Sequence, residues 1–295
     1  MSAKQTRPIG LIGYPLEHSF SPQMHNHAFE VLGLNYVYLT LPIVPAQLKN
    51  AILGLRAMPF VGANVTIPYK EKIIPYLDGL SQNAQRVGAV NTLYWNEQRK
   101  LIGDNTDIAG FQQTLIEFGI DLNGRTATIL GAGGAARAVA LVLAQNQVKE
   151  ISFLTRRPEA VESLLRDLKP LFPEIIWDYH LKTNSQFADL LTRSSFLVNA
   201  TPVGMSPQTE QLPLAEQFIS LLPEGARCYD LVYNPVNTQF MKVAKAKGYK
   251  VYNGLNMLVY QGAHAFKRWT GQEAPVTEMK VLLESQFTPP KSKLI

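Results

Sequence analysis

The sequence of 295 residues has little cysteine and no long apolar run. Its one cysteine, Cys228, cannot form an intrachain disulfide, and no Cys/His spacing matches a zinc site. The first residues lack the apolar core of a secretory signal, and the most apolar helix candidate, Ala135 to Leu143, is too short to span a bilayer. We therefore expect a soluble protein of the reducing cytoplasm with no bound metal and no membrane partner.

Blocks of like charge are also scarce. The 28 Lys and Arg exceed the 23 Asp and Glu by five, and they are scattered apart from Arg156-Arg157 and the tail Lys291 to Lys293. This distribution is typical of a slightly cationic surface and argues against a nucleic-acid partner. Small anionic ligands remain compatible with it.

The remaining composition, 46% hydrophobic and 17% charged, is that of a globular protein. The length predicts roughly two domains at about 150 residues each. Strand-like runs alternate with helical patterns along most of the chain, which indicates an α/β fold with parallel sheets and crossover helices.

The first part of the chain predicts three strands, three helices and a hairpin. Ser21 is the expected N-cap of the first helix, with Pro22 in its first turn and Gly33 at its end. The strands are Arg7 to Gly13, Tyr36 to Pro42 and Val61 to Ile67; the other helices are Pro45 to Met58 and Asp107 to Phe118; the hairpin is Ala89 to Gly103.

The second part has the strand and helix order of a Rossmann-like unit. Its predicted strands are Thr126 to Leu130, Ile151 to Thr155, Phe196 to Ala200, Cys228 to Val232 and Val251 to Asn253, with helices Ala135 to Asn146 and Pro158 to Leu168. The helical segments 255–269 and 276–287 have no strand left to pair, and we expect them to return to the first part.

The sharpest local motif is a glycine-rich turn between a strand and a helix. It comprises Gly131, Ala132, Gly133, Gly134, Ala135 and Ala136, and it matches G-x-G-x-x-A. Glycines let the backbone approach a pyrophosphate, whose charge meets the helix N-terminus. The alternative is a small-residue turn that packs a helix on a strand. The strand-turn-helix context favours dinucleotide binding.

The end of the next strand bears on which dinucleotide is bound. An NAD site usually places an acidic residue there, whereas this chain has Thr155-Arg156-Arg157. Guanidinium groups match a phosphate with forked hydrogen bonds, so these residues favour NADP. The alternative is an exposed arginine pair at a helix entry.

Lys70 and Asp107 could act together in proton transfer. Lys70 follows a predicted strand, and Asp107 ends the sequence GDNTD at the inferred domain junction. The lysine would protonate a developing alkoxide while the carboxylate orients lysine and substrate. From spacing alone, two independent solvated groups are the stronger interpretation.

Further polar groups suit a small acid with several hydroxyls. Ser19 and Ser21 stand at a helix start, where unsatisfied N–H groups attract a carboxylate, although Ser21 could be an ordinary cap. The other candidates are Asn64, Thr66, Asn91 and Asn105. We interpret His25 and His27 as surface or packing residues.

Taken together, the motifs resemble the shikimate dehydrogenases over nearly the whole chain. The matching segments are HSFSP (18–22), GANVTIPYK (62–70), GAVNTL (88–93), GDNTD (103–107), GAGGAAR (131–137), NATPVGM (199–205), YDLVYNP (229–235) and GLNMLVYQGA (254–263). The resemblance implies NADPH-dependent, reversible reduction of 3-dehydroshikimate to shikimate in aromatic amino-acid (chorismate) biosynthesis.

The resemblance also implies roles for individual residues. Lys70 would be the acid/base, with Asp107 as its partner. Ser19 and Ser21 would hold the carboxylate. The residues implied to hold hydroxyls or frame the ring are Asn64, Thr66, Asn91, Tyr233 and Gln261. Those implied to bind cofactor are Gly131, Ala132, Gly133, Gly134 and Ala135 at the pyrophosphate, Thr155, Arg156 and Arg157 at the adenosine phosphate, Leu231, Gly254 and Met257 at the nicotinamide, and Gln82.

The implied architecture is a substrate domain of residues 1–106 and 255–295 and an NADP-binding, Rossmann-like domain of residues 107–254. The family's common NADP loop reads Asn-Arg-Thr with a basic residue three positions on, where this chain has Ala160. Pro158 and Ser21 are less typical of relatives that use NAD or quinate. Two alternatives stay open: a broad-specificity quinate/shikimate dehydrogenase using NAD, and a non-catalytic NADP-sensing regulator. The oligomeric state is open, with a homodimer as one possibility.

Overall fold

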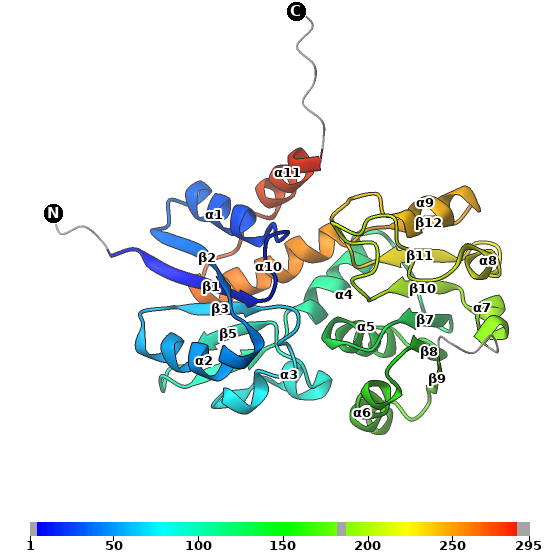
Figure 1. Cartoon of the computed structure of the whole chain (residues 1–295), viewed down its shortest axis with the longest axis horizontal. Coiled ribbons are helices and arrows are strands. Elements are labelled where there is room, and N and C mark those ends of the chain that lie inside the picture. The colour runs from blue at the N-terminus through cyan, green and yellow to red at the C-terminus, as the bar shows by residue number, and fades with distance from the viewer. Residues whose placement is uncertain (1–4, 182–186, 288–295) are drawn as a thin grey trace, which may run out of the picture.

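The computed structural model describes residues 5–181 and 187–287, which form two β-sheets flanked by helices (Figure 1). The basic tail Lys291 to Lys293 lies outside the described residues. The first sheet has the order β2-β1-β3-β5-β6-β4. Its strands are β1 (Arg7–Gly13), β2 (Tyr36–Pro42), β3 (Gly62–Val65), β4 (Gly79–Leu80), β5 (Thr92–Trp95) and β6 (Leu101–Asp104). β5 and β6 pair antiparallel, which confirms the predicted hairpin.

The second sheet is parallel throughout, with the order β12-β11-β10-β7-β8-β9. Its strands are β7 (Thr126–Leu130), β8 (Glu150–Thr155), β9 (Ile176–Leu181), β10 (Phe196–Asn199), β11 (Arg227–Asp230) and β12 (Lys250–Tyr252). The chain order reverses between β7 and β10, as in a Rossmann sheet, where ligands bind at the carboxyl ends of these strands. The predicted fold class is confirmed.

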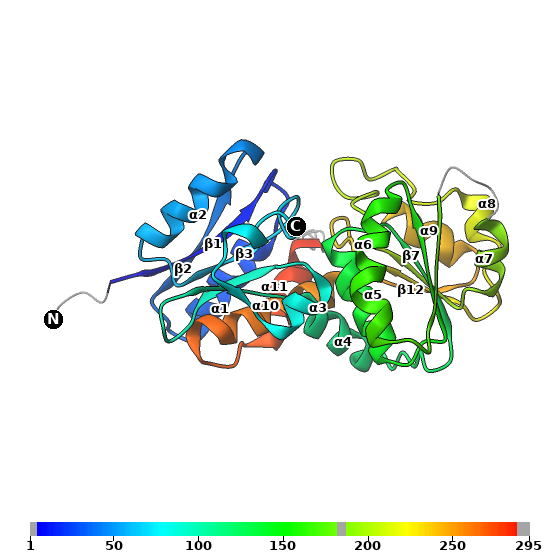
Figure 2. The same ribbon diagram turned by 90° about the horizontal axis from the view of Figure 1, so that it is seen from below.

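The helices surround both sheets. They are α1 (Ser21–Val31), α2 (Leu48–Ala57), α3 (Gln82–Val87), α4 (Asp107–Glu117), α5 (Gly134–Gln145), α6 (Pro158–Leu168), α7 (Ala188–Arg193), α8 (Glu216–Ile219), α9 (Gln239–Ala246), α10 (Leu255–Thr270) and α11 (Val276–Phe287). Figure 2 shows α5 and α6 on one face of the second sheet and α7, α8 and α9 on the other.

The C-terminal helices return to the first sheet, as predicted. Trp269 of α10 donates a hydrogen bond from Nε1 to the carbonyl of Leu93 on β5 (2.9 Å). Met279 and Leu283 of α11 are fully buried in the same apolar cluster as Phe29 of α1. This burial of apolar side chains fixes the returning helices on the sheet.

Helices α4 and α10 lie side by side between the two sheets (Figure 1). Ile108, Phe111 and Leu115 of α4 are buried in the core of the second sheet, together with Met257 of α10. Leu255 and other α10 residues belong to the core of the first sheet. The domain limits 1–106, 107–254 and 255–295 stay a prediction, since these helices join both cores.

The start of α1 differs from the prediction that Ser21 is its N-cap. The helix begins at Ser21, Phe20 is in the cap position, and no side chain caps the helix. The hydroxyl of Ser19 accepts a hydrogen bond from the Ser21 N–H (3.3 Å). The Ser21 hydroxyl therefore does not serve as the cap.

Candidate active site

Two adjoining cavities lie between the sheets. The smaller, of about 160 Å³, is lined by all the residues to which the resemblance gives a role in catalysis or substrate binding: Ser19, Ser21, Asn64, Thr66, Lys70, Asn91, Asp107, Tyr233 and Gln261. The larger, of about 990 Å³, is lined by residues 131–135 of the glycine turn and by Thr155, Arg156 and Arg157. Thr66, Lys70 and Ala135 line both cavities. The two predicted sites are therefore contiguous.

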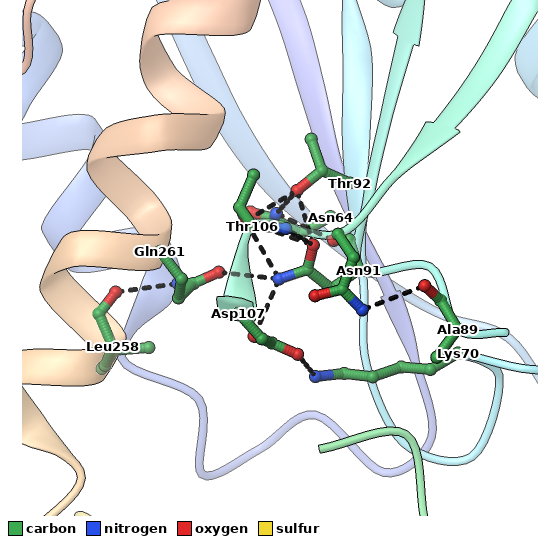
Figure 3. Close-up of polar contacts among 10 residues, drawn as sticks. Asn64, Lys70, Ala89, Asn91, Thr92, Thr106, Asp107, Leu258 and Gln261 are labelled. Carbon is green, nitrogen blue, oxygen red and sulfur yellow. Dashed lines mark hydrogen bonds and ion pairs between the residues drawn. The ribbon is translucent and has the colours of Figure 1, made fainter. Parts of the chain in front are cut away.

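Lys70 and Asp107 form an ion pair where the cavities meet. Lys70 Nζ lies 2.5 Å from Asp107 Oδ2, and the two side chains are 16% and 6% exposed (Figure 3). Asp107 is the first residue of α4, where the helix dipole favours a negative charge. Its Oδ1 accepts a hydrogen bond from Asn91 (2.8 Å). The fold thus pairs two residues that spacing alone left independent.

Asn91 joins three elements of the smaller cavity. Its Nδ2 lies within hydrogen-bond distance of Asp107 Oδ1, Thr106 Oγ1 (3.0 Å) and Gln261 Oε1 (3.3 Å), as Figure 3 shows. Its Oδ1 accepts from the Thr106 backbone N–H (2.8 Å). Asn91 therefore fixes the start of α4, which carries Asp107, relative to Gln261 on α10.

Asn64, on β3, has its amide hydrogens occupied within the protein. Its Nδ2 donates to the Asn91 carbonyl (3.0 Å) and to Thr92 Oγ1 (3.1 Å). Its Oδ1 accepts from the hydroxyl of Tyr38 (2.7 Å). Burial raises the pKa of Tyr38 well above its usual value, so this phenol remains a donor. Asn64 can therefore offer a ligand hydroxyl only the second lone pair of Oδ1.

Ser19 and Ser21 face the smaller cavity at the N-terminus of α1. Neither hydroxyl serves as the N-cap, and both can donate a hydrogen bond to an anion at this helix start. Tyr233 lies close by: burial raises its pKa, and hydrogen bonds to Ser19 and to the Phe20 backbone oppose that shift. Tyr233 thus contributes a neutral hydroxyl.

Asn105 differs from the other predicted polar residues. It is buried, lines neither cavity, and donates through Nδ2 to the Ala89 carbonyl (2.9 Å). This bond ties the segment before α4 to residue 89, and the geometry gives no support to a ligand contact by Asn105. Sequence reasoning missed Thr92 and Thr106, whose hydroxyls lie 3.1 Å apart and support the amides of Asn64 and Asn91. The repeated Asn-Thr pairs at 91–92 and 105–106 were the available signal.

The histidine interpretation holds for His25. Its ring is fully buried and stacks on Tyr38, with centroids 4.6 Å apart. Burial lowers the pKa of His25 to about 3, so the ring is neutral near pH 7 and serves for packing.

The glycine turn fits a dinucleotide. Gly131 has φ +103°, and a Cβ there would meet Thr201 Cγ2 at 2.8 Å. Gly133 precedes α5, and a Cβ there would meet only Arg157 Nη2, at 3.9 Å, so the backbone faces open space. The N-terminus of α5 therefore opens into the larger cavity without side chains in front of it, as a pyrophosphate requires.

Arg156 and Arg157 are exposed and line the larger cavity directly after β8. Thr155 Oγ1 accepts a hydrogen bond from the Arg157 N–H (2.9 Å) and so shapes this turn. Within residues 5–181 and 187–287, neither arginine has a carboxylate in ion-pair distance. Both guanidinium groups are available to a phosphate.

The residues predicted at the nicotinamide, Leu231, Gly254 and Met257, line the smaller cavity beside Ala135. Gln82 does not join them. It is the exposed first residue of α3 and lines neither cavity. The geometry therefore gives no support to a role of Gln82 in cofactor binding.

Sequence reasoning also missed Asp230, which supports the loops after β10 and β11. The side chain is fully buried and accepts hydrogen bonds from Asn199 Nδ2 (2.9 Å), the Val232 N–H (3.0 Å) and Thr238 Oγ1 (2.6 Å). Asn199 in turn accepts from the Thr201 hydroxyl (2.6 Å). The network connects the loop 200–203 of the larger cavity with Leu231 of the smaller one.

Burial raises the pKa of Asp230 from 3.8 to about 6. The folded protein then binds more protons than the unfolded chain between these values, so this residue lowers the unfolding free energy as pH rises through that window, by about 1.4 kcal/mol per pKa unit. Asp230→Asn keeps the shape and removes the titration. We expect its urea midpoint, relative to wild type, to be higher at pH 7.5 than at pH 4.5.

Asp189→Asn, at an exposed position of α7, is the matched control and should show no such change. A wild-type-to-Asp230→Asn difference that is the same at both pH values would contradict the raised pKa.

Among the described residues, no helix is long and apolar enough to cross a membrane. In the same part of the chain, no three His, Cys, Asp or Glu side chains are grouped so as to hold a metal ion.

The Rossmann-type sheet, its glycine turn and the adjoining polar cavity define a two-lobed, dinucleotide-binding α/β protein of the dehydrogenase class. Two family models match the chain: a shikimate dehydrogenase substrate binding domain at residues 11–93 and a shikimate 5'-dehydrogenase C-terminal domain at residues 254–283. A shikimate dehydrogenase (NADP(+)) of Microcystis aeruginosa is 42% identical over 288 residues, which cover 96% of this chain and 98% of the relative. The chain belongs to the shikimate dehydrogenase family.

Solved structures agree with this assignment. A shikimate dehydrogenase crystallised with NADP+ has a TM-score of 0.85 and 40% identity, covering 98% of both chains. A shikimate 5-dehydrogenase of Listeria monocytogenes in complex with shikimate and NAD has a TM-score of 0.83 and 37% identity, covering 95% of this chain and 97% of that one.

Proposed function

We propose that this protein is an NADP-dependent shikimate dehydrogenase that reversibly reduces 3-dehydroshikimate to shikimate in aromatic amino-acid biosynthesis. One observation carries the proposal: the Lys70–Asp107 ion pair lies where the polar cavity meets the glycine-turn cavity. A proton donor at this junction can act on an oxygen whose carbon is within reach of a bound nicotinamide.

The residues of the smaller cavity divide the work of substrate binding. The N-terminus of α1, with Ser19 and Ser21, binds the carboxylate. The residues that contact hydroxyls or frame the ring are Asn64, Thr66, Asn91, Tyr233 and Gln261. Asn64 acts as an acceptor, since its amide hydrogens are committed to Asn91 and Thr92.

Lys70 transfers the proton in both directions. When bound, NADPH supplies the hydride for the carbonyl carbon. As the carbonyl oxygen becomes basic, Lys70 gives it a proton from Nζ, and in the reverse reaction Lys70 accepts that proton. Asp107 holds the ammonium group in place and is itself oriented by Asn91.

The larger cavity binds the cofactor. The turn from Gly131 to Ala135 and the N-terminus of α5 hold the pyrophosphate, and Arg156 and Arg157 hold the 2′-phosphate. Thr155 shapes the arginine turn, while Leu231, Gly254 and Met257 contact the nicotinamide. A family member that was crystallised with NAD makes the cofactor preference a point for direct measurement.

Initial rates of oxidation of shikimate and of quinate, each with NADP and with NAD, test the proposal. We expect kcat/KM for shikimate with NADP to exceed that of the other three pairs by at least about tenfold, because the arginines favour the extra phosphate. Comparable rates with quinate or NAD would indicate the broad-specificity relative. NADPH binding without turnover on either acid would indicate a sensor.

The cytoplasmic location and a homodimeric assembly belong to the same proposal. Light scattering of the purified chain tests the second of these.

A further inference from the structure

Gly134 occupies a place in the glycine turn that dinucleotide binding does not explain. The G-x-G-x-x-A pattern needs small residues at 131, 133 and 136, whereas positions 134 and 135 are its two adjacent x positions, where any residue is allowed. Gly134 is the first residue of α5, and it has no positive φ that would demand glycine. Another contact must account for it.

That contact is with Lys70. A Cβ built on Gly134 would lie 3.0 Å from Lys70 Cβ, 3.2 Å from Lys70 Cδ and 3.3 Å from Ala89 Cβ. All three atoms belong to the first lobe, and none belongs to the turn that faces the cofactor cavity. The start of α5 therefore packs directly on the lysine side chain.

We propose that Gly134 is a positioning residue for Lys70: its missing side chain lets α5 rest on the methylene chain of the lysine and hold Nζ against Asp107. This inference rests on the proposed function, since it concerns the proton donor of that reaction. The glycine turn then has two functions: it lines the cofactor cavity, and at Gly134 it also packs against the acid/base of the first lobe.

The surroundings limit how this contact could be relieved. The Lys70 carbonyl accepts a hydrogen bond from the Val90 N–H (2.7 Å), which fixes the backbone of the lysine. On the other side, Arg137 of α5 donates to the Val87 carbonyl (2.9 Å) and to Asp167 (3.0 Å). Both backbones are thus fixed close to the contact.

The consequence of an added methyl group follows from these restraints. Contacts of 3.0–3.3 Å are shorter than ordinary van der Waals contacts, so a neighbouring group must move by a few tenths of an ångström. The lysine chain beyond Cβ or the start of α5 would have to shift, and we expect this shift to displace Nζ from the position set by Asp107 (2.5 Å; Figure 3). Small displacements of a catalytic group cost rate without changing the binding of distant ligand parts.

The test compares Gly134→Ala with Gly133→Ala, whose methyl group would enter the open cofactor side. For Gly134→Ala we expect kcat for shikimate oxidation to fall about tenfold at saturating NADP, where a changed cofactor affinity does not lower the rate. The Kd for NADPH is measured by fluorescence alongside, because Gly134 also lines the cofactor cavity. Gly133→Ala should instead raise the Kd for NADPH. The pH profile of kcat should also shift for Gly134→Ala, since the proton donor has moved.

A double variant shows whether Gly134 acts through the lysine. In a Lys70→Ala background, Gly134→Ala should cost less than about twofold in residual rate, because the group it positions is gone. An unchanged kcat for Gly134→Ala would overturn the proposal. So would weaker NADPH binding that accounts for the loss, or an equal loss in the Lys70→Ala background. If wild type does not turn over shikimate, the proposed function fails instead.

Discussion

Replacing Lys70 by alanine is expected to lower kcat for shikimate oxidation by about 100- to 10,000-fold, the range for removal of a positioned acid or base. The substitution removes an ammonium group that lines both cavities. NADPH binding should change little, because the glycine turn and the arginines remain. Steady-state rates with saturating shikimate and NADP, together with NADPH fluorescence titration, measure both quantities.

Two further variants make this result interpretable. Lys49→Ala removes an exposed lysine from α2, away from both cavities, and should retain wild-type kcat. Asp107→Asn keeps the hydrogen-bonding shape beside Lys70 but removes the charge that holds it, so we expect an intermediate loss of kcat. Near-normal turnover by Lys70→Ala, with intact NADPH binding, would exclude Lys70 as the acid/base.

The sequence predicted the strands and helices around the cofactor site because their signals are local. β7 and α6 match the predicted ranges to the residue, and α5 begins one residue early. Strand propensity, a glycine turn and Pro158 at a helix start all act within a few residues. In the same part of the chain, β9, α7, α8 and α9 were missed. β9 is an edge strand of intermediate burial, so its apolar residues do not form a continuous run.

The geometry of the candidate site was harder to predict from the sequence, because it depends on contacts between segments that are distant in the chain. Spacing favoured independent solvated groups for Lys70 and Asp107, and only the resemblance to a family paired them. Tyr38 orients the amide of Asn64 by donating a hydrogen bond to it, but Tyr38 is in β2 and its local sequence does not indicate that role. Asp230 likewise lies within a strand, and its contacts with Asn199 and Thr238 form only when the sheet is assembled.

The N-cap prediction for Ser21 failed for a related reason. A serine before Pro22 satisfies the local pattern of a cap, but the chain reaches α1 with Phe20 in that position. Phe20 contacts the rings of Tyr233 and Phe287, with centroids 6.3 and 5.0 Å apart. Both aromatic partners are distant in the sequence, so no local pattern could show these contacts. With Phe20 in the cap position, the Ser21 hydroxyl faces the smaller cavity.

Replacing both Arg156 and Arg157 by alanine is expected to raise KM for NADP by about 100-fold or more while KM for NAD changes less than about threefold. A hydrogen bond between charged groups is worth about 1.5–3 kcal/mol, and solvent screening reduces this value for exposed side chains, which leaves about tenfold or more for each arginine. NAD lacks the 2′-phosphate and has nothing to lose at this position.

Single variants and a control divide the effect between the two arginines. Thr155 fixes the Arg157 backbone, so Arg157→Ala leaves the turn itself intact, and any loss then belongs to the guanidinium. Arg166→Ala, at an exposed position in the last turn of α6, removes the same charge away from the larger cavity and should leave both KM values unchanged. If the double variant raises KM for NADP and NAD equally, the arginines bind the pyrophosphate or attract both cofactors through their positive charge, and they do not recognise the 2′-phosphate. The preference for NADP over NAD would then have to come from other residues that line the larger cavity.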